Sequence, residues 1–411
     1  MAKTKIYVGL EIGTSKTCMV VGEVHPDATA TIIGIGEVRS AGVSAGEIAE
    51  PSMVRQCVSD AWIAAQNNTD VDIVNVVLAV TGEHIYGENN VGSYRLPDTE
   101  KTIMAHHVYE ADRNAEEVEI PRDHFVLHRE LGGYSVDGKD PCLSPEGLTG
   151  RTLDVNCHVI HGVSTRLQNS LFLVRDVPLE VDRLVFAPLA AAQVALNRQQ
   201  KEAGALLIDI GGGTTDYICY MGGDIVASGC IPAGGNTICR KIMEATGMTF
   251  AAAEALKCAE GNAAGNQSDN EVVQHSTDTG FQSVISRGLL NQIIYNCLWT
   301  DILEKVRDSV ITKLTPKVWE QARLSVYFTG GTSLMRGLEV LALRAFNKPV
   351  YMHHTSVPLD RQKPSYLANP RYCTAIGLIR YAQRYDEEKA MANPGLMSRC
   401  MTFVRTLFSR N

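Results

Sequence analysis

The sequence predicts an α/β protein built from two similar lobes that face one another across a ligand. Three patterns carry this prediction: two Gly-containing hairpins at 8–17 and 206–231, and a strand, Gly-Gly turn and helix at 325–338. A chain of 411 residues is long enough for two or more domains with cores of their own. Its composition, 45% hydrophobic and 20% charged, is ordinary for a folded protein of this class.

The first hairpin, VGLEIGTSKT at 8–17, contains the residue types of a phosphate-binding P-loop but in a different order. A P-loop reads G-x-x-x-x-G-K-[ST] and runs into a helix whose N-terminus helps to hold the phosphate. Here Ser15 precedes Lys16, and the residues after Lys16 read as a second strand. Gly13, Thr14 and Ser15 should therefore form a tight turn whose backbone N–H groups can approach an anion. Taken alone, an ordinary hairpin explains the stretch better.

The second hairpin repeats the pattern of the first. An apolar strand ends in Glu11-Ile12-Gly13 in the first copy and in Asp209-Ile210-Gly211 in the second, and each is followed by a small-residue turn and another strand. Two sets of backbone donors are thus expected to hold a polyphosphate from both sides. We expect Glu11 and Asp209 to hold a magnesium ion through its waters, because Mg²⁺ is a hard cation that keeps part of its hydration shell.

The third pattern, SVYFTGGTSLMRGL, reads as a strand, a Gly-Gly turn and a helix. Gly330 and Gly331 have no side chains, so a flat base or a ribose can approach their backbone closely. A Gly-Gly turn says little by itself. Its place after the two hairpins makes it the expected third part of a nucleotide site.

Charge and patterning exclude several functional classes. The formal net charge of −8 argues against a general nucleic-acid binder, which would carry a basic surplus. No apolar run reaches the roughly 18 residues of a membrane span. The N-terminus MAKTKIYVGL lacks the apolar core of a signal peptide, so we expect a cytoplasmic protein. Eleven scattered cysteines without a C-x-x-C pair indicate reduced, mostly buried thiols.

Two further patterns suggest chemistry but favour a structural interpretation. The pairs His106–His107 and His353–His354 suggest a metal site, yet neighbouring residues on one strand point to opposite faces and chelate poorly. The stretch GVSAG at 42–46 matches the nucleophile elbow G-x-S-x-G, but no helix is expected to start at its Ser. The run 289–314 has apolar spacing and predicts a long core helix.

The order of hairpin, hairpin and strand-Gly-Gly-helix resembles that of the actin-like ATPase superfamily. Within it, the chain resembles the FtsA family of bacterial cell-division proteins from Ile6 to the C-terminus. The hairpin glycines are shared across the superfamily, whereas Glu11 and the insertion after VTGEHI point to FtsA. The strings that carry the resemblance are GLEIGTSK (9–16), VVLAVTGEHI (76–85), DIGGGTTD (209–216), IPAGGNTICRKI (231–242), AEALK (253–257), FTGGTSLMRGL (328–338) and YCTAIGLIRY (372–381).

The resemblance implies a two-lobed actin-like fold, which is a duplicated ribonuclease-H-like α/β fold, with ATP and Mg²⁺ between the lobes. It also implies the FtsA-type subdomain 1C and a C-terminal amphipathic helix. The expected divisions are subdomain 1A at 1–82 and 164–200, 1C at 83–163, 2A at 201–230 and 286–385, 2B at 231–285, a linker at 386–395 and the membrane-targeting helix at 396–411.

The resemblance also implies which residues bind the nucleotide. They comprise the first and second phosphate motifs, a segment that closes over the nucleoside, a ribose- and base-contacting pair, and the adenosine motif. For the pair Glu254 and Lys257, a solvated i,i+3 ion pair is the alternative. The expected nucleotide-binding residues are Gly13, Thr14, Ser15, Lys16, Asp209, Gly211, Gly212, Gly213, Thr214, Gly234, Gly235, Asn236, Glu254, Lys257, Gly330, Gly331 and Thr332.

One departure from the superfamily concerns hydrolysis. Chaperones and bacterial actins of this fold place a Glu before a Pro to orient the attacking water, and here Ala187 precedes Pro188. Ala cannot orient water or accept a proton. We therefore expect an ATP-binding switch with weak or negligible ATPase activity and no catalytic residue.

The C-terminal tail LMSRCMTFVRTLFSRN predicts a helix that lies in a membrane interface. At about 100° per residue its apolar side chains share one arc of roughly 160°, and three Arg and no acid occupy the other side. A helix docked on the protein's own core or on a partner is the alternative. The expected membrane-binding residues are Leu396, Met397, Arg399, Cys400, Phe403, Val404, Arg405, Leu407, Phe408 and Arg410.

By resemblance, the protein should polymerise head to tail through 1C and 2B, bind the C-terminal tail of the tubulin-like protein FtsZ at 2B, and recruit other division proteins. It should lie on the cytoplasmic face of the bacterial inner membrane at midcell, attached to anionic lipid. Two alternatives stay open: a soluble PilM-type pilus-assembly adaptor, which would not need the cationic tail, and a chaperone-type ATPase or kinase, which should carry a water-orienting acid.

Overall fold

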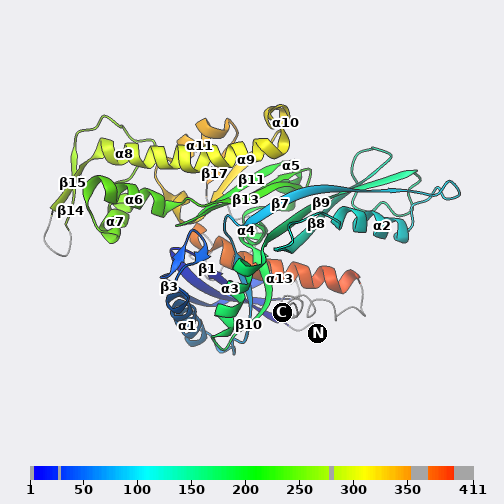
Figure 1. Ribbon diagram of the computed structural model, residues 1–411, viewed down its shortest axis with the longest axis horizontal. Helices are drawn as coiled ribbons and strands as arrows, with labels where there is room; N and C mark the ends of the chain where they lie inside the picture. The colour runs from blue at the N-terminus through cyan, green and yellow to red at the C-terminus, as the bar shows by residue number, and fades with distance from the viewer. Residues whose placement is uncertain (1–3, 26–28, 277–281, 353–368, 393–411) are drawn as a thin grey trace.

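The chain folds into two lobes, each built on a five-stranded mixed sheet (Figure 1). The computed structural model describes residues 4–25, 29–276, 282–352 and 369–392. The expected membrane-targeting helix at 396–411 and the pair His353–His354 lie outside these ranges. Across the described ranges, no helix has both the length and the hydropathy that crossing a membrane requires.

The first lobe has a sheet of strand order β10-β6-β1-β2-β3. Strands β1, β2 and β3 run antiparallel, and β6 and β10 lie parallel to β1. The expected first hairpin is β1–β2, with the turn between Ile12 and Lys16. The strands are β1 (Lys5–Ile12), β2 (Lys16–Val24), β3 (Ala30–Arg39), β6 (Asn75–Val80) and β10 (Glu180–Phe186).

The second lobe repeats this topology in a sheet of order β13-β12-β11-β16-β17. Three antiparallel strands again precede two strands parallel to the first of them. The shared order confirms the predicted duplication of an α/β unit. The strands are β11 (Ala205–Ile210), β12 (Thr215–Met221), β13 (Asp224–Ile231), β16 (Ser325–Thr329) and β17 (Val350–Met352).

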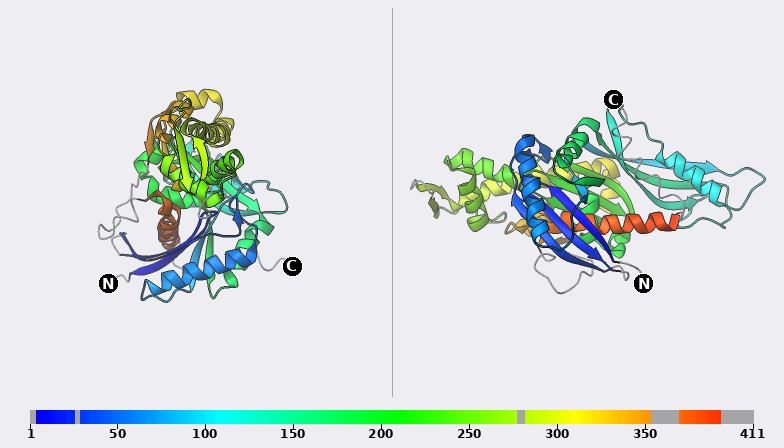
Figure 2. Two further views of the ribbon diagram at one scale, coloured as in Figure 1. Left: turned by 90° about the vertical axis from the view of Figure 1, so that its left-hand side faces the viewer. Right: turned by 90° about the horizontal axis from the view of Figure 1, so that it is seen from below.

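Helices cover both faces of the first sheet, with α1 on one face and α13 on the other (Figure 2). Close contact requires glycine on β1, where a Cβ at Gly9 would lie 2.5 Å from the Ala375 carbonyl oxygen of α13. A short hairpin, β4 with β5, precedes α1. These elements are β4 (Val43–Ser44), β5 (Glu47–Ile48), α1 (Pro51–Asn67), α3 (Ser164–Arg175), α4 (Ala187–Ala195) and α13 (Cys373–Ala392).

Helix α13 corrects two expectations. Its residues Ala375, Leu378 and Ile379 belong to the core of the first lobe, although the range expected for 2A, 286–385, assigned this part of the helix to the second lobe. The helix also continues to Ala392, past the expected start of the linker at 386. A polar stretch can continue a helix, because ion pairs between residues one turn apart, such as Arg384 and Glu388, stabilise the helix on its surface.

The second lobe is mostly covered by helices that follow β13. The predicted helix at 289–314 is confirmed: α8, η1 and α9 continue one another over that range, with one π-helical stretch. The elements are α5 (Arg198–Ala203), α6 (Gly235–Thr246), α7 (Phe250–Glu260), β14 (Val272–Ser276), β15 (Gln282–Ser286), α8 (Arg287–Asn296), η1 (Cys297–Leu303), α9 (Glu304–Leu314), α10 (Pro316–Gln321), η2 (Gly331–Leu334), α11 (Leu338–Phe346) and η3 (Pro370–Tyr372).

The insertion at 83–163, which we call 1C, forms a three-stranded antiparallel sheet with one helix and its own small core. It projects at one end of the molecule, while α6, α7, β14 and β15 form the other end (Figure 1). Its elements are β7 (Ile85–Arg95), α2 (Ala105–Glu116), β8 (His124–Val136) and β9 (Thr152–Val163).

Although 1C is inserted into the first lobe, polar contacts tie it to β13 of the second. The Asp224 carboxylate accepts hydrogen bonds from Gly133 N–H (2.9 Å) and from Asn156 Nδ2 (3.0 Å). His158, which is 2% exposed, lies 2.6 Å from Asn89 Oδ1 and 2.7 Å from Ser228 Oγ. We call these contacts the 1C–β13 clamp, because they link 1C to the strand that leads into the expected nucleotide loop at 233–236.

Candidate functional site

The predicted nucleotide-binding residues line one cavity between the two lobes. Its volume is about 520 Å³, within the roughly 300–1,000 Å³ of small-molecule sites. Glu11 and every expected nucleotide-binding residue except Gly234 line it. Gly234 does not line the cavity, and a Cβ at this position would lie 2.6 Å from the Gly211 carbonyl oxygen. The structure therefore brings motifs from distant parts of the chain together.

The two hairpin turns close in the same way and face each other. Gly13 N–H donates to the Lys16 carbonyl oxygen, and Gly211 N–H donates to the Thr214 carbonyl oxygen, each over 2.9 Å. The turns approach so closely that a Cβ at Gly212 would lie 2.8 Å from a side-chain atom of the first turn. Small residues are therefore needed where the two turns meet, and their backbones converge on the cavity.

Lys16 lies beneath the first turn and is paired with Glu11. Its Nζ atom is 2.5 Å from Glu11 Oε2, and the lysine is 7% exposed. Burial alone would lower the pKa of Lys16, but the Glu11 carboxylate together with further neighbours, among them Cys18 and Glu37, raises that pKa above its ordinary value. The lysine is therefore a fixed positive charge in the cavity wall. Glu11, expected to hold metal-bound water, is at the same time the partner of this lysine.

Two aspartates, the half-buried Asp209 and the buried Asp216, provide the acidic part of the cavity. Burial, together with Asp216 and Glu11, raises the pKa of Asp209 to about 7. Burial raises the pKa of Asp216 to about 6, against hydrogen bonds that include one from Thr81. Thr374 donates to Asp209 Oδ2 over 2.8 Å. These two carboxylates lack a cationic side chain in direct contact among the described residues, so a bound cation would stabilise their charged forms.

Glu254 and Lys257 lie at the other end of the cavity, on α7. Lys257 is 5% exposed, and its Nζ atom is 2.5 Å from Glu254 Oε2 and donates to the Gly235 carbonyl oxygen over 3.3 Å. This burial contradicts the alternative of a solvated surface pair. The Gly-Gly turn lies in the same wall: Gly330 has a φ of +87°, which favours glycine.

Sequence reasoning missed several residues that line the cavity. Asp216 was visible at the end of DIGGGTTD, where an acidic residue shortly after three glycines was a usable signal. Arg336 lies within the third pattern at 325–338 but was not singled out. Thr81, Arg371 and Thr374 carry no local signal, because the fold brings them in from segments outside the three patterns. The missed residues include Thr81, Asp216, Arg336, Arg371 and Thr374.

Comparison with known proteins decides the family. A cell division protein FtsA of Escherichia coli strain K12 is 32% identical over 387 residues, covering 92% of this chain and 90% of the relative. The chain belongs to the FtsA family. A cell division protein FtsA of Neisseria meningitidis serogroup B is 31% identical over 398 residues, covering 94% and 92%. The family model for cell division protein FtsA matches 206–377, and that of the SHS2 domain inserted in FtsA matches 82–161.

Solved structures support the actin-like fold of this FtsA-family chain. A PilM–PilN type IV pilus biogenesis complex aligns with a TM-score of 0.61 at 17% identity, covering 90% of this chain and 97% of the other. MreB5 of Spiroplasma citri bound to ADP aligns with a TM-score of 0.53 at 15% identity, covering 94% and 98%. At these identities the likeness concerns the fold alone.

Ala187, which we expect to occupy the position of the superfamily's water-orienting Glu, is the first residue of α4 and lines the cavity. Its methyl group has no proton to give or take. The cavity does contain an acidic residue that was not among the expected site residues, Asp216. Its carboxylate can accept a proton, so it is a candidate for assisting slow hydrolysis of ATP.

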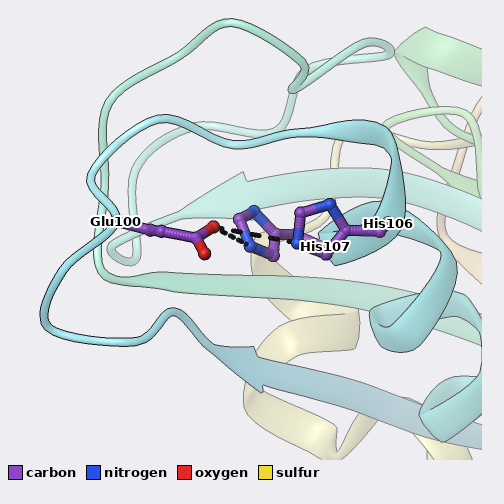
Figure 3. Close-up of side chains that lie close together, drawn as sticks. All are labelled: Glu100, His106 and His107. Atoms are coloured by element: carbon purple, nitrogen blue, oxygen red, sulfur yellow. Dashed lines mark ion pairs between the residues drawn. The ribbon is translucent and has the colours of Figure 1, made fainter.

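A second cluster, Glu100 with His106 and His107, lies in 1C away from this cavity (Figure 3). The sequence analysis placed both histidines on a strand, which is wrong: they begin α2. His107 Nε2 lies 2.8 Å from Glu100 Oε2, but His107 Nδ1 accepts the Met104 N–H over 3.1 Å. The proton of the neutral imidazole is therefore on Nε2, where a metal would need the lone pair. The cluster fits an N-terminal cap of α2 better than a metal centre.

Proposed function

We propose that this protein is an ATP-binding, membrane-attached cell-division protein that polymerises on the cytoplasmic face of the inner membrane at midcell and anchors the FtsZ ring. In this role it recruits later division proteins. The observation that carries the proposal is the cavity between the lobes, in which the two duplicated hairpins converge in a chain of the FtsA family.

The phosphates of ATP would lie between the hairpins, because backbone N–H groups, Lys16 and small residues meet there. The nucleoside would lie toward Glu254, Lys257 and the Gly330-Gly331 turn. A neighbour of the same fold, MreB5 of Spiroplasma citri, was solved with ADP, which supports a nucleotide as the ligand of this cavity.

The donor set fits a magnesium ion. Glu11, Asp209 and Asp216 provide oxygen ligands, which Mg²⁺ prefers. Asp216 is buried and Asp209 is half-buried, and neither has a cationic partner in direct contact among the described residues. When bound, Mg²⁺ supplies charge neutralisation for the β- and γ-phosphates. The chain's own part is to hold its carboxylates toward that ion, directly or through water, and to keep Lys16 charged beside them.

Hydrolysis would be slow in this proposal, because Ala187 occupies the position from which the superfamily orients water. The nucleotide would then act as a switch for polymerisation. The bound state would hold the two hairpins together, since both donate to the same phosphates, and so favour one arrangement of the lobes.

Filaments would form by head-to-tail contact between 1C of one subunit and 2B of the next. The two modules lie at opposite ends of the longest axis of the molecule (Figure 1), which suits an open, heterologous contact that can grow without closing. A MamK double helical filament shares the fold, with a TM-score of 0.52 at 14% identity. The C-terminal tail of FtsZ would bind at 2B.

Membrane attachment would come from the tail at 396–411. Its three arginines face anionic lipid, each contributing on the order of 1 kcal/mol, and its apolar arc enters the acyl boundary. A short helix binds weakly alone, but a filament presents many tails at once and so binds strongly. A soluble PilM-type adaptor is the alternative, and the likeness to the PilM–PilN complex, at 17% identity, supports only a shared fold.

Co-sedimentation with liposomes tests this function. The full chain should sediment with anionic liposomes more strongly in ATP and Mg²⁺ than without nucleotide, and a chain lacking 396–411 should stay in the supernatant. The matched control replaces Arg399, Arg405 and Arg410 by Glu, which keeps the apolar arc and reverses the charge. Undiminished sedimentation of the truncated chain, or binding that does not respond to ATP, would favour the soluble adaptor.

A further inference from the structure

Thr374 lies in the nucleotide cavity but belongs to none of the three motifs that predicted it. It is the second residue of α13 and is 4% exposed. Its hydroxyl group donates to Asp209 Oδ2 over 2.8 Å. A threonine hydroxyl near a helix N-terminus has other acceptors available in its own backbone, so this orientation toward an aspartate of the opposite lobe calls for an explanation.

The backbone of Thr374 is fixed to the first lobe. A Cβ at Gly9 of β1 would lie 2.5 Å from the Ala375 carbonyl oxygen, and a side chain at Gly377 would collide with the Ala190 carbonyl oxygen of α4. Cys373 Sγ lies 3.5 Å from the Ala191 carbonyl oxygen. The first turns of α13 are therefore packed tightly between β1 and α4, so the Thr374 hydroxyl has little freedom to move.

Asp209, by contrast, is the penultimate residue of strand β11 of the second lobe, and its carboxylate lies between two neighbours. Oδ2 accepts the Thr374 hydroxyl. On the other side, a side chain at Gly330 would collide with Oδ1. The carboxylate is thus held by a donor from the first lobe, with Oδ1 in the space that the missing side chain of Gly330 leaves free, while Asp209 still lines the cavity.

We propose that Thr374 is a positioning residue for the metal of the nucleotide site: its hydroxyl orients the Asp209 carboxylate toward Mg²⁺ bound with ATP. This inference rests on the proposed function. Hydrogen-bond partners of metal-holding carboxylates fix their orientation, and losing one weakens metal affinity by about 10- to 100-fold. Because the donor and the acceptor belong to different lobes, the bond also couples metal binding to the relative position of the lobes.

A magnesium titration of ATP binding tests this role in the full chain. Binding of a fluorescent ATP analogue is measured against Mg²⁺ concentration, and again in excess EDTA. Thr374→Val keeps the shape but removes the donor, so the Mg²⁺ concentration for half-maximal binding should rise about tenfold or more. Thr374→Ser keeps the donor and should restore it to near the wild-type value. In EDTA the three proteins should bind the analogue equally.

Thr329→Val is the matched control. Thr329 is equally buried, at 2% exposed, and its hydroxyl donates to the Pro370 carbonyl oxygen, so its loss disturbs the strand beside Asp209 without removing a hydrogen bond to the Asp209 carboxylate. It should titrate like the wild type. If Thr374→Val does not fold, Thr374→Ala takes its place, because it lacks the hydroxyl without adding an apolar group beside Asp209.

The outcomes separate this inference from the proposed function. A wild-type Mg²⁺ titration in a folded Thr374→Val or Thr374→Ala variant would overturn the inference, as would a loss of affinity that is the same with and without Mg²⁺. In both cases the wild type would still bind ATP with Mg²⁺, and the proposed function would stand. A wild-type chain that does not bind the analogue at all would contradict the proposed function itself.

Discussion

Thr81 in the first lobe donates its hydroxyl group to the carboxylate of Asp216 in the second lobe. Both residues line the cavity between the lobes, and neither was among the residues expected to bind nucleotide. Within the described ranges a second hydroxyl of the first lobe, that of Thr374, donates to the other cavity aspartate of the second lobe, Asp209. The two carboxylates that face the nucleotide cavity are therefore also the ones that accept hydrogen bonds from the opposite lobe.

Turnover of ATP should be slow and should depend on Asp216. Because Ala187 cannot orient water, we expect purified protein to hydrolyse ATP below roughly 1 s⁻¹, the lower edge of ordinary enzyme rates. Asp216→Asn should remove most of the remaining activity, since the amide cannot accept a proton. A phosphate-release assay measures both. Turnover well above this limit would contradict the interpretation of Ala187.

Lys16 should contribute strongly to ATP affinity. Lys16→Ala removes a buried positive charge beside the phosphate turn and leaves Glu11 without its partner, so the Kd for ATP should rise by about 10- to 100-fold, the equivalent of a charged hydrogen bond worth about 1.5–3 kcal/mol. Isothermal titration calorimetry measures it. Lys5→Ala is the control, because Lys5 lies on the same hairpin but pairs with Asp386. Equal affinities for the two variants would place the phosphates elsewhere.

The 1C–β13 clamp should stabilise the folded chain. Asp224→Ala leaves the Gly133 N–H and the Asn156 amide without their acceptor, which should lower the free energy of unfolding by about 1–3 kcal/mol. Urea unfolding measures the change, and limited proteolysis should show earlier cleavage within 1C. Asp154→Ala is the control: Asp154 accepts from Ser93 on the exposed surface of 1C. If the two variants unfold alike, the clamp does not hold 1C to the second lobe.

The same clamp should make stability depend on pH through His158. Burial, with Lys313 nearby, lowers the pKa of His158 to about 4, against an ordinary value of 6.5. The folded state therefore binds fewer protons than the unfolded state between these values. The contribution of neutral His158 is present above pH 6.5 and is lost as the pH falls toward 4.

Melting temperatures at pH 7 and pH 5 measure this dependence. His158→Gln should show a smaller drop between the two pH values than the wild type, because it has no proton to gain. Asn156→Ala also breaks a clamp contact but removes no titrating group, so its melting temperature should be lower at both pH values with an unchanged drop. A drop in His158→Gln as large as that of the wild type would refute the role of His158.

Short patterns predicted the cavity well because its floor is made of backbone. The glycines and small residues of the two hairpins and the Gly-Gly turn can be recognised in the sequence, since few other residues allow such close approach. Thr81 and Thr374 cannot be recognised in this way. The role of a single hydroxyl group at a strand end or a helix start becomes apparent only when the structure shows which residue of the other lobe lies beside it. Asp216 stood next to a recognised motif and could have been included.

Helix packing was harder to predict than the site. Apart from one glycine, nothing local in α13 indicates that it belongs to the first lobe, because its apolar face would suit either sheet. Gly377, within the helix, was the usable signal, since a glycine there marks a close approach such as the one to α4. The polar run after Asp386 was read as a linker, although Asp386 accepts from Tyr7 and Arg183 and holds the helix to the first lobe.

Electron microscopy of the full chain on an anionic lipid monolayer, with ATP and Mg²⁺, tests the central claim most directly. We expect filaments that lie on the lipid, that are lost when 396–411 is deleted, and that are lost in Lys16→Ala at an ATP concentration that its weakened affinity leaves far from saturating. Filaments that form equally well without the tail or without ATP, or their absence under all of these conditions, would contradict a nucleotide-dependent, membrane-attached polymer.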